Sequence, residues 1–239
     1  MMKKIKAWFL VLLVSIIIGG LFWGGGFLIR SESETSGGKK SIRLPSPKHK
    51  GELSVEEAIF RRRSIRRYKD EPLTLEEVSQ ILWAAGGKTI DGITGATRAY
   101  PSAGGIYPLE IYLVAGSVEG LTSGIYHYRW REHSIDLVKE GDFRQNLTRA
   151  ALGQRMIANA PVSIVFTAIY SRTTGRYGRR GETRYVPMDI GGAGQNVHLQ
   201  AEALGLGTVI IGAFRNGAVK EALGVKDETP LYIMPVGKP

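Results

Sequence analysis

The chain has 239 residues, enough for one globular domain with an appendage, and its 43% hydrophobic residues suit a domain with a buried core. It contains no cysteine, which excludes thiol catalysis, disulfides and cysteine-ligated zinc. The net charge of +10 is concentrated in residues 1–50, so the nearly neutral remainder argues against a nucleic-acid-binding domain.

The N-terminal segment predicts a membrane attachment. Residues 7–29 carry no charge and follow three lysines. As a helix, such a segment would span about 35 Å, more than the roughly 30 Å of a hydrocarbon core. We therefore predict a membrane anchor or uncleaved signal over residues 1–30, with cleavage near the glycines at 24–26 as the alternative. The lysines before the segment favour a cytoplasmic N-terminus, so this single-pass anchor would place the domain outside the cytoplasm.

The remainder divides into a tether and a folded domain. Residues 31–50 are rich in Ser, Gly, Lys and Pro, which predicts a flexible tether before a domain at 51–239. Capping boxes at Ser54 and Thr74 predict helices that end near Arg63 and at Gly86. Strands are predicted at 109–115, 124–130, 134–139, 161–169, 208–211 and 230–236, helices at 142–152, 186–204 and after Asn216, and a basic loop at 171–184. Because no regular βαβ repeat appears, we predict an α+β fold.

Five arginines and a serine lie together at 61–68, where the first helix is expected to end. Guanidinium groups bind phosphate oxygens through planar, multidentate contacts. The cluster therefore fits either a phosphate site for a cofactor or a basic surface that touches lipid or nucleic acid. If the helix continued, Arg62 and Arg66 would share one face, and Arg63 and Arg67 another.

Three further segments are rich in small residues. The segment 98–110 contains two prolines that stiffen it, and its Ser102 could donate to a ring carbonyl. Residues 189–196 place several glycines inside a predicted helix, which suggests close packing or a nearby cofactor. His198, on the same helix, is expected to be structural. Gly212, just after a predicted strand, could present its backbone amide to a ligand.

In this order and spacing, the four segments resemble the nitroreductase family of flavoproteins, most closely its SagB-type (ThcOx-like) dehydrogenase branch. The resemblance covers 53–239, and its most specific motifs lie at 62–66, 101–105, 107–110 and 195–207. It implies a nitroreductase-like α/β sandwich, with a central mixed or antiparallel sheet flanked by helices. The predicted N-terminal hydrophobic helix would precede this domain. The resemblance also implies a homodimer with FMN at its interface.

The resemblance implies roles for particular residues. Arg62 and Ser64 would contact the FMN phosphate with Arg63 beside them, and Arg66 would approach the N1–C2=O edge of the ring. The complete set of implied cofactor-binding residues is Arg62, Arg63, Ser64, Arg66, Pro101, Ser102, Ala103, Gly104, Ile211 and Gly212. Gly212 would face N5. No metal site and no catalytic acid or base are assigned, although Tyr107, Tyr177 and Arg184 are candidates. Lys238 is the basic residue that remains beyond the last strand.

These implications predict an FMN-dependent oxidoreductase. It would move hydride through FMN N5 between a donor such as NAD(P)H and a small nitro or quinone acceptor, or would dehydrogenate a C–N substrate. The competing hypothesis is a membrane-anchored, non-enzymatic module whose arginine cluster binds anionic lipid or nucleic acid.

Overall fold

The computed structural model describes residues 41–92 and 95–239. Within these residues, we find no helix with the length and apolar character needed to cross a membrane. The hydrophobic helix and anchor predicted over 1–30 fall outside the described residues, as does the first half of the predicted tether.

A seven-stranded sheet forms the centre of the described domain, and each pair of neighbouring strands in it is antiparallel. The strand order is β1-β6-β5-β4-β7-β9-β8. The strands are β1 (Ser41–Arg43), β4 (Leu109–Ala115), β5 (Gly124–Arg129), β6 (Ser134–Glu140), β7 (Val162–Ala168), β8 (Gly207–Thr208) and β9 (Thr229–Gly237). A separate hairpin contains β2 (Lys88–Gly92) and β3 (Gly95–Arg98). The predicted α+β fold with a large antiparallel sheet is confirmed.

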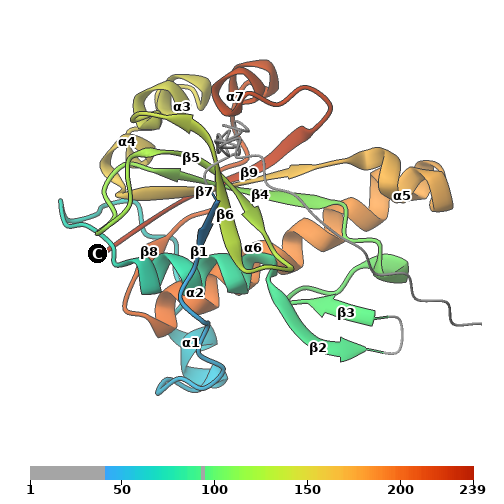
Figure 1. Ribbon diagram of the computed structural model, residues 1–239, viewed down its shortest axis with the longest axis horizontal. Helices are drawn as coiled ribbons and strands as arrows, with labels where there is room; N and C mark the ends of the chain where they lie inside the picture. Colours follow the sequence, from blue (N-terminus) through green and yellow to red (C-terminus); the bar gives the residue numbers. More distant parts are fainter. Residues whose placement is uncertain (1–40, 93–94) are drawn as a thin grey trace, which may run out of the picture. The chain divides into compact units, whose positions relative to one another are not determined.

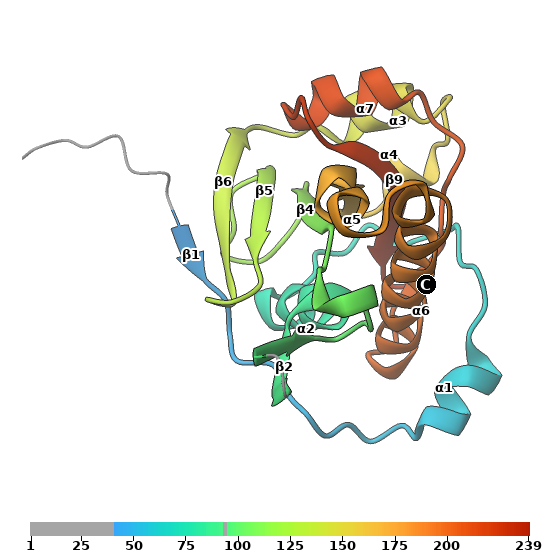
Figure 2. The same ribbon diagram turned by 90° about the vertical axis from the view of Figure 1, so that its right-hand side faces the viewer.

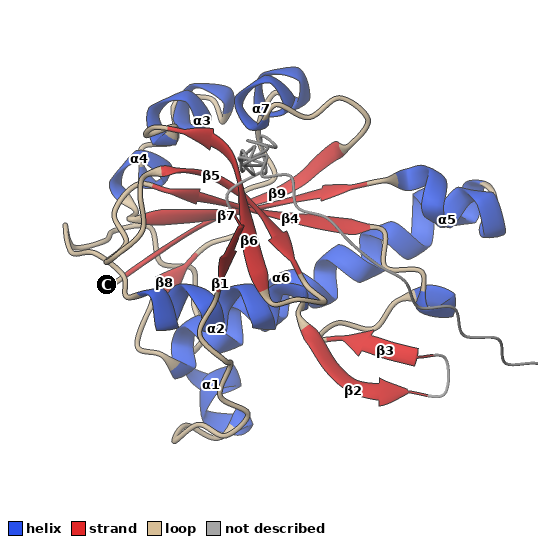
Figure 3. Ribbon diagram, in the orientation of Figure 1, coloured by secondary structure: helices blue, strands red, loops and turns tan. Residues whose placement is uncertain are grey.

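Helices cover both faces of this sheet (Figures 1 and 3). On one face lie α2 (Leu75–Gly86) and α6 (Val186–Ala203), with α1 (Val55–Arg61) packed against α6. On the other face lie α3 (Arg144–Ala150), α4 (Met156–Asn159) and α7 (Asn216–Leu223). The helix α5 (Tyr170–Tyr177) follows β7 and leads through a π-helical turn at Gly181–Tyr185 into α6. The helices therefore form two layers with the sheet between them.

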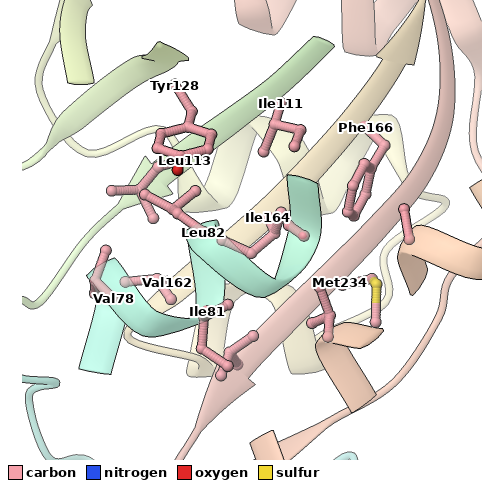
Figure 4. Packing of buried hydrophobic residues seen from close by; sticks show 14 of the residues in the cluster. Val78, Ile81, Leu82, Ile111, Leu113, Tyr128, Val162, Ile164, Phe166 and Met234 are labelled. Carbon is pink, nitrogen blue, oxygen red and sulfur yellow. The ribbon is translucent and has the colours of Figure 1, made fainter. Parts of the chain in front are cut away.

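The central strands are apolar on both faces because each face packs against helices. In β4, Ile111 and Leu113 belong to the core beneath α2 and α6, whereas Tyr112 and Val114 belong to the core beneath α3, α4 and α7. Figure 4 shows the first of these cores, where side chains of α2 pack over Ile111 and its neighbours on β4 and β7. Side chains of a strand alternate between faces, so continuous apolar runs are required here.

The strand predicted at 208–211 is confined to Gly207–Thr208, and three further segments differ in kind from the sequence prediction. Residues 41–50, assigned to the tether, belong to the folded domain: Leu44 is 4% exposed, and β1 pairs with β6. The basic loop predicted at 171–184 contains α5 and the π-helical turn. The glycine-rich stretch before β4 contains the β2–β3 hairpin. Each of these segments is polar, so its structure depends on contacts with distant residues rather than on a local apolar pattern.

Candidate functional site

The arginine-rich segment is extended. The helix α1 ends at Arg61, and Arg62 has a ψ of 122°. Ser64 forms a parallel bridge with Thr208, and the Ile65 amide donates to the Thr208 carbonyl at 2.9 Å. The predicted helical pairing of arginines is therefore wrong. In an extended chain, side chains alternate, so Arg62, Ser64 and Arg66 fall on the side opposite Ile65.

Packing holds this segment along β8. A Cβ built on Gly207 would lie 2.6 Å from Cγ2 of Ile65, so only glycine lets the Ile65 side chain approach the strand backbone. The Tyr68 hydroxyl donates to the carbonyls of Ile65 at 2.7 Å and Pro235 at 3.2 Å. The segment therefore extends the sheet edge, with its arginines at the end of β8.

The basic residues here differ in their partners. Arg61 forms an ion pair with Glu57 at 3.1 Å, and Lys238 pairs with Glu71 at 3.2 Å. In the described part of the chain, Arg62, Arg63 and Arg66 form no ion pair. Their guanidinium groups therefore have no carboxylate partner within this part of the chain, and their assignment to a phosphate stays a prediction.

His198 on α6 lies close to Arg62 of this segment. It is 5% exposed, and burial, followed by the positive charge of Arg62, lowers the pKa of His198 to about 4. A neutral imidazole beside Arg62 adds no charge of its own near neutral pH. The expected structural role of His198 agrees with its burial, and its proximity to Arg62 is visible only in the structure.

The loop at 99–107 lies along α6 and contacts it at Asp189 and Asn196. Asn196 donates to the Ala99 carbonyl at 2.7 Å, and the Ser102 hydroxyl donates to Oδ2 of Asp189 at 2.6 Å. Ser102 Oγ also accepts the Tyr107 amide at 3.0 Å. A hydroxyl has a single proton, so Ser102 cannot also donate to a ring carbonyl while this bond is present. The donor role expected for Ser102 is therefore not available in this conformation.

Asp189 is a buried carboxyl, 4% exposed. Burial raises the pKa of Asp189 to about 6, although the Ser102 hydrogen bond and the nearby Arg98 act in the opposite direction. Arg98 is itself buried: its guanidinium lies 5.0 Å from the ring centre of Tyr100 and donates to the carbonyls of Gly86 and Leu109. The interior beside the loop thus contains a carboxyl that titrates near neutral pH.

Gly104 is the point where the loop meets α5. Its φ is 63°, and a Cβ there would lie 2.6 Å from the Tyr177 hydroxyl, so a larger residue would be both strained and obstructed. Tyr177 lies edge-on to Tyr185, with ring centres 4.8 Å apart. Arg184 is exposed in the π-helical turn. Of the three catalytic candidates, Tyr177 contacts the loop directly.

Ile211 and Gly212 follow β8. Ile211 is buried and exchanges two backbone hydrogen bonds with Ile233 of β9. Gly212 is exposed, and a Cβ built on it would meet no atom within 4 Å. The backbone before Gly212 is therefore fixed by the hydrogen bonds of Ile211, whereas the space beside Gly212 itself is open.

The predicted site residues form two groups within one protomer. The first group contains Arg62, Arg63, Ser64, Arg66, Ile211 and Gly212, beside β8 and the half of α6 that carries His198. The second contains Pro101, Ser102, Ala103 and Gly104, on the half of α6 that carries Asp189. Gly194 packs between the two halves against Tyr232 and Ile210, which confirms the packing role expected for a glycine in this helix.

A polar cavity of about 830 Å³ adjoins the second group and was missed by sequence reasoning. Tyr107 lines it, together with Glu110, His127 and Arg172. Glu110 contacts His127 at 2.7 Å and Arg172 at 2.5 Å. Burial raises the pKa of Glu110, but the His127 hydrogen bond and the Arg172 charge outweigh it, so the net pKa is lowered. Glu110 lies in a recognised motif, but His127 and Arg172 come from other elements and carry no local signal.

The Nitroreductase family matches residues 59–238. A protein from Methanocaldococcus jannaschii, named a nitroreductase, is 44% identical over 202 residues, which cover 84% of this chain and 98% of that protein. The trifolitoxin-processing protein TfxB of Rhizobium leguminosarum bv. trifolii is 29% identical over 143 residues, which cover 56% of this chain and 38% of that protein. Such processing proteins represent the SagB-type dehydrogenase branch, as the sequence predicted.

Crystal structures agree with these relationships. A nitroreductase-like protein from Anabaena variabilis has a TM-score of 0.72 at 29% identity, covering 84% of this chain but only 42% of its own. Another from Ralstonia eutropha has a TM-score of 0.71 at 26% identity, covering 83% of this chain and 89% of its own. With three quarters of its length matched and the fold shared, the chain belongs to the nitroreductase family of oxidoreductases.

Proposed function

We propose that the chain is an FMN-dependent oxidoreductase whose site is built from the two groups of residues flanking α6. The observation that carries this proposal is the set of Arg62, Arg63 and Arg66 at the end of β8, in a chain that belongs to an oxidoreductase family. Arg63 and Arg66 are exposed, Arg62 is half-buried, and none of the three forms an ion pair among the described residues. A set of guanidinium groups without carboxylate partners is favourable only when it faces water or an anion.

The residues present fit a phosphate-bearing flavin. Arg62 and Ser64 offer charged and neutral donors on one side of an extended segment. Lys238 is already paired with Glu71, so the phosphate would depend on the arginines of this segment. Gly212 presents open backbone, and next to Ser64 the Thr208 hydroxyl is buried without a hydrogen-bond partner. These are features of a site that is completed by a ligand.

Bound FMN would supply hydride transfer at N5. In this proposal Arg62, Arg63 and Ser64 bind the phosphate, and Arg66 places positive charge near the N1–C2=O edge. Gly212 admits the N5 edge because it has no side chain. Pro101, Ala103 and Gly104 line the ring. Ser102 positions this lining but does not donate to the ring, because its proton is held by Asp189.

We propose a homodimer because, within a single chain, α6 lies between the two groups of site residues. The helix α1, which lies near the C-terminal end of α6 in Figure 2, and the first turn of α6 also expose large apolar side chains. Ile59, Phe60 and Met188 are 56%, 90% and 63% exposed. Ile59 and Phe60 are neighbours on α1, and exposed apolar side chains that lie together mark interaction surfaces. A second copy placed here could bring its 101–104 loop towards the arginine segment of the first.

We propose NAD(P)H as electron donor and a small nitro or quinone compound as acceptor, with dehydrogenation of a C–N bond as the second candidate. Similarity to the trifolitoxin-processing protein favours that second candidate. The membrane anchor over 1–30 with an extracytoplasmic domain also remains a proposal, and it rests on the sequence alone. A reporter fused to the C-terminus of the full chain would test the orientation.

The experiment that tests the function uses the purified full-length protein, as isolated and after incubation with FMN. The flavin proposal predicts visible flavin absorbance that remains after gel filtration and is bleached by NADH or NADPH under anaerobic conditions. A colourless protein that retains no FMN would overturn it. If that protein instead bound anionic vesicles with a steep salt dependence, the module hypothesis would replace it.

A further inference from the structure

The bond between Ser102 and Asp189 joins the loop to the first turn of α6. Asp189 lies in the first turn of α6 and forms no ion pair among the described residues. Its carboxylate accepts the Ser102 hydroxyl at 2.6 Å. A charge-assisted bond of this length is stronger than one between neutral groups.

Ser102 also forms hydrogen bonds within the loop, so a restraint on its side chain restrains the following residues. Its oxygen accepts the Tyr107 amide at 3.0 Å, and its carbonyl accepts the Gly105 amide at 3.0 Å. One residue therefore closes the turn 102–107 from both its side chain and its backbone. Removing the Asp189 partner would leave the Ser102 hydroxyl free to rotate away from the geometry in which it accepts Tyr107.

The turn needs such a restraint because its backbone is strained. Gly104 and Gly105 have φ values of 63° and 66°, and Tyr107 has a φ of 53° although it is not glycine. A non-glycine residue in this region costs about 1–2 kcal/mol. Contacts must offset that cost. Tyr107 donates its amide to Ser102, its ring meets Tyr100 edge-on at 5.6 Å, and the Arg98 guanidinium lies 5.9 Å from its ring centre.

We propose that Asp189 is a positioning residue, which through Ser102 locks residues 102–107 in the shape that lines the FMN ring. We call the chain of hydrogen bonds from Asp189 through Ser102 to the Tyr107 amide the lock. The effect on FMN rests on the proposed function, whereas the lock itself does not. Asp189 would act on the flavin only through the loop.

Ionisation of Asp189 should tune this lock. The titratable and charged groups that face it are Arg98 of β3 and Tyr100 of the loop, and Ser102 supplies its hydrogen bond. Burial raises the pKa of Asp189 to about 6, so the carboxyl is charged above that pH and neutral below it. The Ser102 bond is therefore strongest above pH 6 and weakens as the carboxyl takes up a proton.

Hydrogen exchange of the Tyr107 amide tests the lock in the full chain without FMN. After correction for the intrinsic pH dependence, we expect Ser102→Ala and Asp189→Ala to speed exchange by about fivefold, the equivalent of one ordinary hydrogen bond. The double variant should be no faster than Ser102→Ala alone, because both substitutions break one chain of contacts. Independent, multiplying effects of the two substitutions would overturn the proposal.

The isosteric variant Asp189→Asn separates charge from shape. Wild-type Tyr107 should lose protection as the pH falls through about 6, whereas Asp189→Asn should show intermediate protection that stays constant across that range. Asp227→Asn removes an equally sized charge from an exposed position and should behave as wild type. An Asp189→Asn protein with the wild-type pH change would overturn the proposal.

FMN titrations of the same proteins separate this inference from the proposed function. We expect Asp189→Ala and Ser102→Ala to weaken FMN binding by about fivefold, by the same equivalence of one lost hydrogen bond. If wild type bound no FMN, the proposed function would fail, while Tyr107 exchange would still decide the lock. If wild type bound FMN and both variants kept its affinity despite faster exchange, the positioning role would be overturned.

Discussion

Asp189 and His198 lie on opposite sides of α6. They are nine residues apart, and at 3.6 residues per turn this separation is two and a half turns, which places the two side chains about 180° apart around the helix axis. Asp189 accepts the Ser102 hydroxyl, and His198 has its pKa lowered partly by Arg62. The helix therefore stands between the loop at 101–104 and the arginine segment. In the proposed homodimer, the 101–104 loop of a second copy would supply the residues that one copy holds away from its own arginine segment.

Disruption of the exposed α1 surface should weaken both self-association and flavin binding. We expect Phe60→Asn to shift the protein towards monomer and to lower FMN occupancy, because the apolar contact that would bury this side chain is lost. Analytical ultracentrifugation and the ratio of flavin to protein absorbance measure the two effects.

The matched control is Leu152→Asn. Leu152 is 60% exposed, it follows α3 on the other layer, and its φ of 59° suits asparagine. It should leave both quantities unchanged. A Phe60→Asn protein that remains dimeric and fully loaded would exclude α1 from the interface.

The arginines should differ in how they discriminate FMN from riboflavin. Hydrogen bonds to charged groups contribute about 1.5–3 kcal/mol, so loss of Arg62 should weaken FMN binding by roughly 10- to 100-fold. Riboflavin has no phosphate, and its affinity should not change. Arg66→Ala should weaken both ligands, because Arg66 is assigned to the ring. Fluorescence titration of the apoprotein measures each dissociation constant.

Two basic residues serve as controls for this series. Arg61 is paired with Glu57 and Lys238 with Glu71, so alanine at either position should alter FMN affinity little. Exposed ion pairs contribute only about 0–1 kcal/mol to stability, and both variants should fold normally. A large loss of FMN affinity in Lys238→Ala would move the phosphate site towards the C-terminus.

Alanine substitutions at two glycines should distinguish a loss of unfolding free energy from a loss of FMN affinity. Gly207→Ala places a Cβ 2.6 Å from Ile65 in a packed region, and overpacking of this kind costs about 1–3 kcal/mol of unfolding free energy. Gly212→Ala meets no atom within 4 Å, so it should leave the apoprotein equally stable but weaken FMN binding by obstructing the approach of N5.

Thermal unfolding of the apoproteins and FMN titration provide the comparison. Gly217→Ala, also in open space but away from the site, should leave FMN binding unaltered. Wild-type FMN affinity in Gly212→Ala would remove Gly212 from the N5 edge.

The two buried groups on α6 should have opposite effects on stability as the pH falls. The pKa of His198 is lowered to about 4, so its stabilising contribution is complete above its ordinary value near 6.5 and is lost as the pH falls towards 4. The pKa of Asp189 is raised to about 6, so its contribution is complete below its ordinary value near 3.8 and is lost as the pH rises through 6. The two dependences partly cancel between pH 4 and 6.

Denaturant unfolding at several pH values would separate them. Asp189→Asn should make the protein lose stability more steeply on acidification, because only the His198 dependence remains. His198→Gln should give the reverse slope in that range, with stability falling as the pH rises from 4 to 6. Identical pH slopes in both variants and in wild type would contradict these assignments.

Much of the fold follows from local sequence. The strand β4 occupies the predicted residues, β7 and β9 differ from prediction by one or two residues at their ends, and α6 ends one residue earlier than expected. Each carries a continuous apolar run or a capping residue, which acts within a few positions along the chain. The motifs that resemble the nitroreductase family are equally local, and the family was therefore recognisable from the residues alone.

The arrangement of the site depended on contacts between distant segments. The Arg62–Arg66 segment is extended because the Thr208 carbonyl accepts the Ile65 amide and Gly207 makes room for its side chain. The Glu110–His127–Arg172 cluster joins three elements, and the Ser102 proton is directed by a carboxyl 87 residues away. By itself the sequence determined the family and the elements that carry an apolar periodicity or a capping residue, because these are local properties. Only the tertiary structure decided which side chains share a surface and where their protons point, because packing brings together residues that no short pattern connects.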